Sequence, residues 1–409
     1  MKVIVIGAGA AGMMAAVAAA QNGADVTVLE KNEKCGKKIY ITGKGRCNVT
    51  NATTGEEFLR NIPRNPRFLM SALSRFDSND LQDMLKNAGL ELKTERGQRV
   101  FPQSDRASDV TKAFQFLMKK HGVKLLLNTK VKRILQTDGM VTGVESDKGT
   151  FDCDSVIIAT GGISYPSTGS TGDGFAFAKD TGHRVTELYP SLIPILTKEK
   201  WPADISGLTL KNVTLYAKNG KKVIFSELGE MLFTHFGISG PLVLSLSSVI
   251  AGMDISKISV YIDLKPALDQ ETLDKRILRD FEKYQNKQIV NSLRDLLPHN
   301  MIPVILNAAG IDPEKFVNQI SKQERIALLS ALKALPITPV GFRPIEEAVV
   351  TRGGVNIGDI NPRTMESKKI NGLYFAGEVI DVDGFTGGFN LQIAFTTGYA
   401  AGCASAGAV

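Results

Sequence analysis

Three glycines near the N-terminus have the spacing that lets a protein backbone bind phosphate. Gly7, Gly9 and Gly12 lie in the run GAGAAG, which directly follows the apolar stretch Lys2–Ile6. In such a run the first glycine allows a sharp turn, the second lets the backbone approach a pyrophosphate, and the third lets a helix pack on the preceding strand. The run therefore predicts a strand, a phosphate-binding turn and a helix whose N-terminus faces the phosphate charge.

A carboxylate stands where the ribose of a dinucleotide would lie. A second apolar strand is predicted over Asp25–Leu29, and Glu30 follows it, 18 residues after Gly12. A carboxylate there can accept hydrogen bonds from both ribose hydroxyls, but it disfavours the 2′-phosphate of NADP. Strand, turn, helix, strand and acid in this order predict binding of FAD or NAD.

The next segment favours FAD over NAD. Lys31–Asn51 is dense in Gly, Lys, Arg and Asn and has no helical or strand period. Such a segment can lay backbone amides and cations along a pyrophosphate and a polar ring edge, whereas a plain NAD domain would proceed to its next helix. The competing interpretation is a solvated basic loop.

The elements that must position these groups are scattered along the chain. Residues 123–162 read as a β-meander that closes on the apolar strand Val156–Ala159 and the turn Thr160–Gly162. Near the C-terminus, the buried strand Gly372–Ala376 is followed by an acidic turn and by a glycine pair that opens an apolar helix near Asn390. We therefore expect one nucleotide-binding fold assembled from distant segments.

Six motifs spread over nearly the whole chain resemble a known family. They are GAGAAG (7–12), TGKGRCNVTN (42–51), RVFPQSDRASDV (99–110), ATGGISYPSTGSTGDGF (159–175), GEMLFTHFGISGP (229–241) and TMESKKINGLYFAGEVIDVDGFTGGFNLQIAFTTG (364–398). Together they resemble the bacterial FAD-dependent oxidoreductases of the aminoacetone-oxidase-like and bile-acid-reductase-like group. One departure is Lys44, where many relatives carry glycine, and it affects only the local shape of the loop.

The resemblance implies an α/β protein with a Rossmann-like FAD-binding domain of the two-dinucleotide-fold type and non-covalent FAD. For the pyrophosphate and nearby groups it implies Gly7, Gly9, Ala10, Ala11, Gly12 and Lys31; for the ribose, Glu30; and for the adenine, the backbone of Val131. For the flavin side it implies Arg46, Cys47 and Asn48; for the ribityl or phosphate groups, Glu378 and Asp381; and for the pyrimidine edge, Gly388, Phe389, Asn390 and Leu391. It also implies FAD contacts for Thr160 and Gly161, which follow the closing strand, and for Gly377.

The helix near Asn390 has a direct electrostatic interpretation within this resemblance. Its free N–H groups and positive dipole end would point at flavin N1 and the C2 carbonyl, where negative charge gathers on reduction. We therefore expect the helix to favour the anionic reduced flavin.

The region between the two parts of the FAD-binding domain, 1–190 and 340–409, changes character twice. Residues 191–265 alternate as strands with turn signals, which predicts a β-barrel-like domain that 325–345 could complete. Residues 266–330 carry charged and apolar residues at helical spacing and predict a small helical domain. No second GxGxxG follows a strand here, so NADH or NADPH, if used as a co-substrate, must reach the flavin through the substrate cleft.

Few side chains are candidates for chemistry beyond the cofactor. Tyr165 and His235 could each enter a cleft and transfer a proton, or could have structural hydrogen-bonding roles. Arg352 could anchor an anionic substrate, and a structural role explains it equally well. The spacing of 12 residues between Cys35 and Cys47 does not force the two sulfurs to bonding distance, so a disulfide reductase is not expected. No His, Cys or Asp residues have the spacing of a metal site, so no metal is expected.

Composition limits the class of protein. A length of 409 residues suits two or three domains, and a hydrophobic fraction of 43% allows a packed core. Four cysteines form no disulfide framework, which favours a reducing cytoplasm. Apart from the glycine-containing N-terminus, no apolar run is long enough to span a membrane. The net charge of +7 is modest, so we expect a small-molecule substrate rather than nucleic acid or a membrane, and the oligomeric state is not predicted.

The predicted function is hydride transfer through flavin N5. The preferred reaction is NAD(P)H-linked reduction of a C=C bond in a steroid-like or bile-acid-like enone, because the large inserted region could cover a bulky apolar substrate. One alternative is a flavin amine oxidase that acts on a small amine such as aminoacetone. Another is a flavin-containing RNA-associated protein, suggested by the basic loop and the +7 charge, whose binding would fall steeply with salt.

Overall fold

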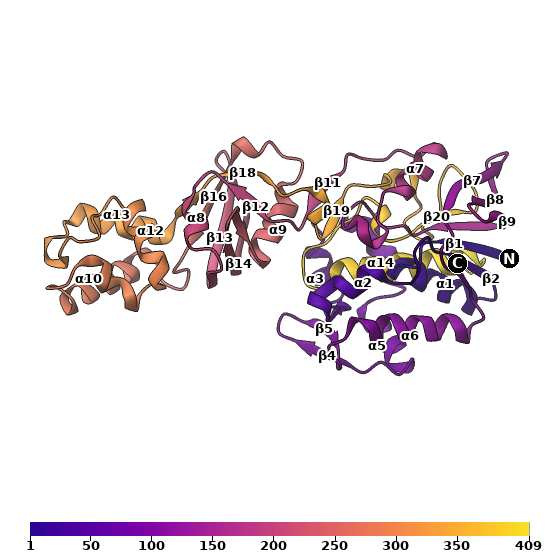
Figure 1. Ribbon diagram of the computed structural model, residues 1–409, viewed down its shortest axis with the longest axis horizontal. Coiled ribbons are helices and arrows are strands. Elements are labelled where there is room, and N and C mark those ends of the chain that lie inside the picture. The colour runs from indigo at the N-terminus through magenta and orange to yellow at the C-terminus, as the bar shows by residue number, and fades with distance from the viewer. Residues whose placement is uncertain (409) are drawn as a thin grey trace. The chain divides into compact units, whose positions relative to one another are not determined.

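The chain folds into two compact units, as a computed structural model of residues 1–408 shows (Figure 1). The first unit contains residues 1–191 together with the chain from Pro344 on, and the second contains Leu192–Arg343. Each unit has its own cluster of buried apolar side chains. The second unit is therefore an insertion that separates two parts of the first unit in sequence.

The first unit is built on a parallel sheet with the strand order β20-β10-β1-β2-β6. The strands are β1 (Lys2–Ile6), β2 (Asp25–Leu29), β6 (Lys124–Leu126), β10 (Ser155–Ile158) and β20 (Leu373–Phe375). The apolar run of β1 is buried from Val3 to Ile6, as expected for a central parallel strand that is covered on both faces. Segments from the beginning, the middle and the end of the chain thus form one sheet.

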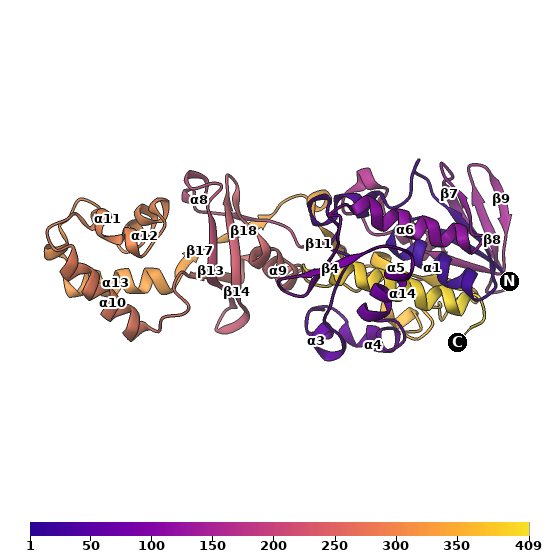
Figure 2. The same ribbon diagram turned by 90° about the horizontal axis from the view of Figure 1, so that it is seen from below.

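Helices α1 (Ala10–Gln21) and α14 (Phe389–Ser405) run beside one another in the first unit (Figure 2). The contact depends on small residues. A Cβ atom on Gly398 of α14 would clash with the carbonyl oxygen of Ala11 on α1, so only glycine allows this approach. The helix that follows the glycine run is thereby packed directly against the C-terminal helix.

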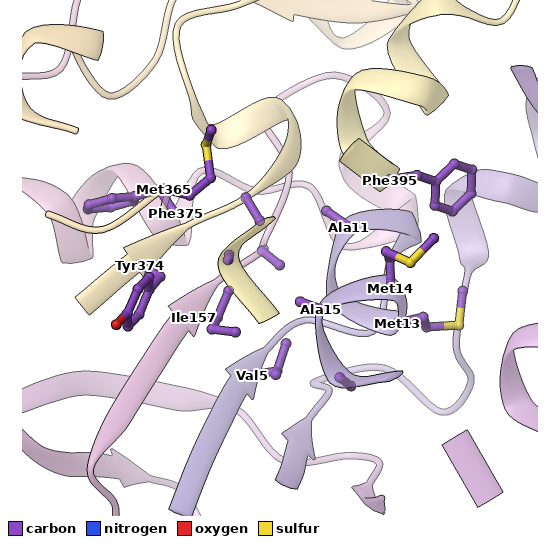
Figure 3. Packing of buried hydrophobic residues seen from close by; sticks show 14 of the residues in the cluster. Val5, Ala11, Met13, Met14, Ala15, Ile157, Met365, Tyr374, Phe375 and Phe395 are labelled. Atoms are coloured by element: carbon purple, nitrogen blue, oxygen red, sulfur yellow. The ribbon is translucent and has the colours of Figure 1, made fainter. Parts of the chain in front are cut away.

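The core beneath these helices joins the sheet to both of them (Figure 3). Val5 of β1 and Ile157 of β10 are partners in register, and Figure 3 shows them beside Ala15 of α1. Phe395 of α14 is fully buried, and its ring stacks on that of Phe114 with the ring centroids 5.1 Å apart. Apolar side chains from all parts of the first unit therefore position the C-terminal end of β1 and the N-terminal end of α1.

Smaller elements complete the first unit. One antiparallel sheet has the order β3-β5-β4, with β3 (Thr50–Asn51), β4 (Leu92–Glu95) and β5 (Arg99–Pro102). A second has the order β7-β8-β9, with β7 (Val131–Thr137), β8 (Met140–Ser146) and β9 (Gly149–Asp152). The third pairs β11 (Tyr189–Ser191) with β19 (Val350–Arg352). The remaining helices are α2 (Lys37–Ile41), α3 (Gly55–Arg60), α4 (Met70–Leu73), α5 (Ser78–Asn87), α6 (Ala107–Lys120) and α7 (Asp173–Asp180).

The second unit contains a sheet with the strand order β17-β16-β13-β14-β15-β12-β18. Its strands, all paired antiparallel, are β12 (Ile195–Thr197), β13 (Thr209–Asn219), β14 (Lys222–Thr234), β15 (Gly237–Ser239), β16 (Ile258–Asp263), β17 (Leu335–Ile337) and β18 (Pro339–Phe342). A turn at Gly220 and Lys221 connects β13 to β14 in a long hairpin. Burial alternates along β13 and β16, so one face of these strands is turned to the core and the other away from it.

Helices of the second unit share the core of this sheet. They are α8 (Trp201–Asp204), α9 (Pro241–Ile250), α10 (Gln270–Lys283), α11 (Ile289–Ser292), α12 (Ile302–Ala308) and α13 (Lys322–Lys333). The start of α13 is a capping box in which Ser321 and Glu324 bond to each other's backbone N–H groups. The predicted helical spacing of this region thus corresponds to helices with one buried stripe.

Two features are absent from residues 1–408. No helix in this part of the chain combines the length and the apolar character needed to cross a membrane. Within the same residues, no group of three or more His, Cys, Asp or Glu side chains is arranged to hold a metal ion.

Candidate functional site

The N-terminus of α1 presents backbone N–H groups at the end of β1. The first intrahelical hydrogen bond joins the N–H of Met13 to the carbonyl of Gly9, so the N–H groups of Ala10, Ala11 and Gly12 precede it. A Cβ atom on Gly12 would clash with the carbonyl oxygen of Gly7, which explains the close packing of the turn on the helix. This geometry suits the predicted pyrophosphate.

Glu30 follows β2 and is 7% exposed. One carboxylate oxygen accepts from the N–H of Ala8 at 2.7 Å, and the other accepts from the N–H and the side-chain amide of Asn32, both at 2.8 Å. The N–H of Thr129 donates to the Glu30 carbonyl, which brings the start of β7, with Val131, to the same end of the sheet. A carboxylate has about four acceptor positions and three are occupied, so capacity for about one ribose hydroxyl remains.

Lys31 is held by the glycine-rich turn that precedes α7. Its ammonium donates to the hydroxyl of Thr171 at 2.5 Å and to the carboxylate of Asp173 at 2.6 Å. The side chain therefore ties this turn to the end of β2, and its predicted contact with FAD stays a prediction.

The loop that contains Arg46, Cys47 and Asn48 lies between α2 and β3. Arg46 donates to the carboxylates of Glu95 and Asp105, which raise its pKa, and its guanidinium lies 4.2 Å from the ring centroid of Phe101. Cys47 is fully buried, and burial raises the pKa of its thiol to about 12. The thiol therefore stays protonated near neutral pH and is a poor nucleophile.

Two buried polar atoms test whether this region fits a polar ligand such as FAD. Among residues 1–408, no hydrogen-bond partner is found for Oδ1 of Asn48 or for Oγ1 of Thr160. An unsatisfied buried polar atom costs about 1–3 kcal/mol, so native proteins rarely leave one without a ligand, water or ion. Both residues belong to the predicted FAD set, and Thr160 follows β10 directly before Gly161. The residues present therefore fit the cofactor.

Glu378, which follows β20 and Gly377, is the centre of a network that joins four segments. Its carboxylate accepts from Lys38 at 2.7 Å, from the Ser164 hydroxyl at 2.9 Å and from the Thr351 N–H at 2.8 Å. Burial opposes ionisation of this carboxyl, but Lys38 and the hydrogen bonds outweigh burial and lower its pKa. Glu378 is thus an ionised acceptor whose predicted contact with ribityl or phosphate groups remains a prediction.

Asp381 is engaged by an arginine that the sequence patterns did not identify. Arg64 donates to both carboxylate oxygens, at 2.5 and 2.7 Å, and the Asn65 amide donates to the Asp381 carbonyl at 2.6 Å. The Asp381 side chain is 4% exposed. Nearby in the fold, burial lowers the pKa of Arg352, whose charge interacts with Asp383. The acidic turn after β20 is therefore held by the ion pair of Asp381 with Arg64, beside the charge of Arg352.

The N-terminus of α14 resembles that of α1 in the groups it presents. The N–H of Gln392 donates to the carbonyl of Gly388, so the N–H groups of Phe389, Asn390 and Leu391 precede the first intrahelical bond. The Asn390 side chain accepts from the N–H of Gly384 and donates to its carbonyl, which closes the preceding loop. Asn390 therefore offers its backbone N–H, rather than its amide, to the predicted pyrimidine edge.

The two candidate proton donors lie in different units. Tyr165 belongs to the first unit, in a left-handed backbone conformation with φ of 51°, and its N–H donates to the carbonyl of Glu346. His235 belongs to the second unit, where it is exposed and its ring packs edge-on against that of Phe236. Their catalytic roles stay predictions.

Sequence patterns missed Lys38, Ser164, Thr351 and Arg64, which hold the carboxylates of the site. Lys38 belongs to the basic loop, but its partner Glu378 is 340 residues away. No local spacing could reveal such a pair.

Comparison with known proteins agrees with this geometry. A family model described as the HI0933-like protein Rossmann domain matches residues 1–404. A 3-dehydro-bile acid delta(4,6)-reductase from Clostridium scindens is 32% identical over 410 residues, which cover 99% of each chain. A ribosomal RNA dihydrouridine synthase from Haemophilus influenzae is 34% identical over 403 residues, which cover 97% of this chain and 96% of the relative.

A solved structure shares the fold. It is the 3-ketosteroid-delta4-(5alpha)-dehydrogenase from Rhodococcus jostii RHA1 in complex with 4-androstene-3,17-dione. The match has a TM-score of 0.53 at 15% sequence identity and covers 99% of this chain and 96% of the dehydrogenase chain. The comparisons confirm the predicted family resemblance and the predicted Rossmann-like FAD-binding fold class. The name of the Haemophilus influenzae relative leaves the RNA alternative open.

Proposed function

Because this chain belongs to the HI0933-like family and is an FAD-dependent oxidoreductase, we propose that it saturates a C=C bond conjugated to a carbonyl, with NADH or NADPH as the electron donor. One observation supports this most directly: two relatives that match nearly the whole chain are named for bile-acid reduction and for the synthesis of dihydrouridine. Both names denote the addition of two hydrogens across a C=C bond of a ring that carries a conjugated carbonyl.

The site supports a redox role for the protein through orientation and electrostatics. Bound FAD would supply the two-electron hydride chemistry. The first-turn N–H groups of α1 and α14 would hold the pyrophosphate and the pyrimidine edge, and the Asn48 amide would gain a partner that the protein does not provide. Because Cys47 remains a thiol, this proposal assigns no covalent step to the protein.

The reaction also requires a proton on the carbon next to the one that accepts hydride. Tyr165 and His235 carry the side chains proposed for this role, because a phenol and an imidazole can both transfer protons. The backbone of Tyr165 is held by hydrogen bonds to Glu346 and Thr168, so a turn of defined conformation presents its side chain.

Two substrate classes satisfy the same chemistry. A steroid-like enone is favoured by the bile-acid reductase, and the uracil ring of RNA is favoured by the dihydrouridine synthase. Both rings carry the C=C bond in conjugation with a carbonyl, so hydride addition is assisted in the same way. The reaction class is therefore better supported than either substrate.

Anaerobic mixing experiments test the reaction. We expect NADH or NADPH to bleach the visible flavin absorbance of the purified protein, and a 3-oxo steroid dienone or a uridine-containing RNA to restore it with formation of the saturated product. Mass spectrometry of the product would show a gain of two hydrogens. Bleaching by aminoacetone without a nicotinamide, followed by peroxide formation in air, would contradict the proposal and favour an amine oxidase.

A further inference from the structure

The outward face of the sheet in the second unit carries a row of side chains across four strands. Pro336, Tyr261, Tyr216 and Ser226 lie opposite one another on β17, β16, β13 and β14. The residues before and after each tyrosine are buried core residues. Because successive side chains of a strand point to opposite faces, the row faces away from the core of this unit.

The two tyrosine rings in this row stack on each other. Their centroids are 5.1 Å apart, their planes differ by 18°, and both side chains are partly exposed. The next position in the row is Ser226, whose side chain is too short to cover an aromatic ring. The stack formed by Tyr216 and Tyr261 can therefore be extended by another flat ring.

Positive charge adjoins the stack. The ammonium of Lys218 lies 5.8 Å from the centroid of Tyr216 and 5.7 Å from that of Tyr261, within the range of a cation–π contact. The chain then turns, and Lys221 is exposed in this turn, whereas Lys222 pairs with Asn219 and therefore points to the opposite face of the sheet. The hairpin thus presents Lys218 beside the two aromatic rings and Lys221 at its turn.

Acidic groups on this face do not cancel that charge. Asp263 lies two residues after Tyr261 on β16, on the same face of the sheet. Its carboxylate is 2.6 Å from the ammonium of Lys333. Leu228 and Val223, the neighbours on β14, are 64% and 51% exposed and apolar. Glu230 is exposed further along the same strand. The surface around the tyrosines is therefore aromatic and apolar, with Lys218 beside the rings and Glu230 as an acidic group farther along β14.

We propose that Tyr216, Tyr261, Lys218 and Lys221, together called the tyrosine face, bind single-stranded RNA. Bases stack on the tyrosine rings while lysines neutralise neighbouring phosphates, a combination that binds single strands with little dependence on sequence. Paired RNA keeps its base faces covered, so the tyrosine face selects unpaired segments. The proposal rests on the proposed function only in taking a uracil of RNA as the ring that is reduced. RNA binding itself is measured without turnover.

The complete FAD-loaded protein and a fluorescein-labelled, unstructured RNA of about 12 nucleotides, a typical site size, test the proposal by fluorescence anisotropy. Replacing both rings, Tyr216→Ala with Tyr261→Ala, should weaken binding roughly tenfold or more, whereas the corresponding Phe pair should stay within about twofold of the original affinity. A double variant with Ala at Lys218 and Lys221 should lower the slope of log affinity against log salt by roughly one unit.

A matched control comes from the helical part of the same unit. Tyr284 has Lys283 and Lys287 within 4.6 and 4.8 Å of its ring centroid but no stacked tyrosine partner among residues 1–408. Tyr284→Ala should bind the RNA as the unchanged protein does. The thermal midpoint and the flavin absorbance of every variant show whether it remains folded.

Three outcomes would overturn the tyrosine face as an RNA site. They are no saturable binding by the unchanged protein at low salt, equal affinities of the Ala and Phe pairs, and a concentration-dependent dimer that the Ala pair abolishes, which would identify a second copy as the occupant. RNA affinity that depends on the tyrosines, without any C=C reduction, would instead contradict the proposed reaction and leave the tyrosine face intact.

Discussion

At the scale of single residues, Glu378 connects the cofactor site to distant parts of the chain. The carboxylate is bound by Lys38 from the basic loop, by Ser164 from the turn after β10 and by the backbone of Thr351 on β19. A charge held in this way cannot be removed without leaving a partly buried lysine uncompensated. We therefore expect Glu378 to influence stability as well as FAD binding.

The acid stability of the protein should report on Glu378. Its pKa is lowered in the fold, so its contribution is present above the ordinary glutamate value of about 4.3 and is lost as the pH falls through the lowered value. Glu378→Gln should lower the thermal midpoint at neutral pH and make its decline in acid less steep. Thermal unfolding between neutral pH and strong acid measures both effects.

Glu57→Gln, an exposed carboxylate on α3, is the matched control for Glu378→Gln. It should follow the pH profile of the unchanged protein. Parallel acid profiles for Glu378→Gln and the unchanged protein would show that this carboxylate does not couple folding to pH.

At the scale of elements, the packing of α1 on α14 couples the positions of the two helix N-termini. Both helices begin at the predicted cofactor groups, and Gly398 allows the close contact with Ala11. A side chain at this position must displace one helix. The displacement would move the backbone N–H groups that precede the first helical bonds.

Gly398→Ala should therefore reduce both stability and FAD retention. Inserting a methyl group into such a contact costs typically about 1–3 kcal/mol. The free energy of unfolding and the ratio of flavin to protein absorbance measure the two effects. Gly341→Ala is a suitable control, because its Cβ would meet only Leu196, at an ordinary distance of 3.7 Å. Equal flavin retention by the two variants would argue against coupling through the helices.

Elements defined by local spacing could be predicted from the sequence, and partners defined by register could not. The strand, turn and helix around Gly7–Gly12 follow from residues that are neighbours in the chain. By contrast, the contact between Lys38 and Glu378 and the stack of Tyr216 on Tyr261 depend on how distant strands pair. A shift of one residue would turn each tyrosine to the opposite face of the sheet.

At the scale of the whole molecule, the chain leaves and re-enters each unit through neighbouring strands. In the first unit β11 pairs with β19, so Ser191 lies opposite Val350. In the second unit β12 pairs with β18, so Ile195 lies opposite Phe342. The two ends of the inserted segment are therefore close together on both sides of the junction.

A chain in which Ser191 is joined to Pro344 through a short glycine-containing linker tests the independence of the first unit. We expect this shortened protein to fold and bind FAD, because the five-stranded sheet, α1 and α14 all lie outside the deleted residues. Visible absorbance and thermal unfolding check this expectation. A colourless protein that does not respond to added FAD would show that the second unit is needed to form the site.

The adjacent entry and exit strands also bear on how such a protein can change over evolutionary time. Because β11 and β19 lie side by side, a recombination event that replaced everything between them would leave the redox unit with two ends that are already paired. The inserted unit could then be exchanged as a whole, while the predicted cofactor-binding residues on either side were inherited unchanged. Enzymes acting on very different molecules could arise from a single flavin-binding frame in this way.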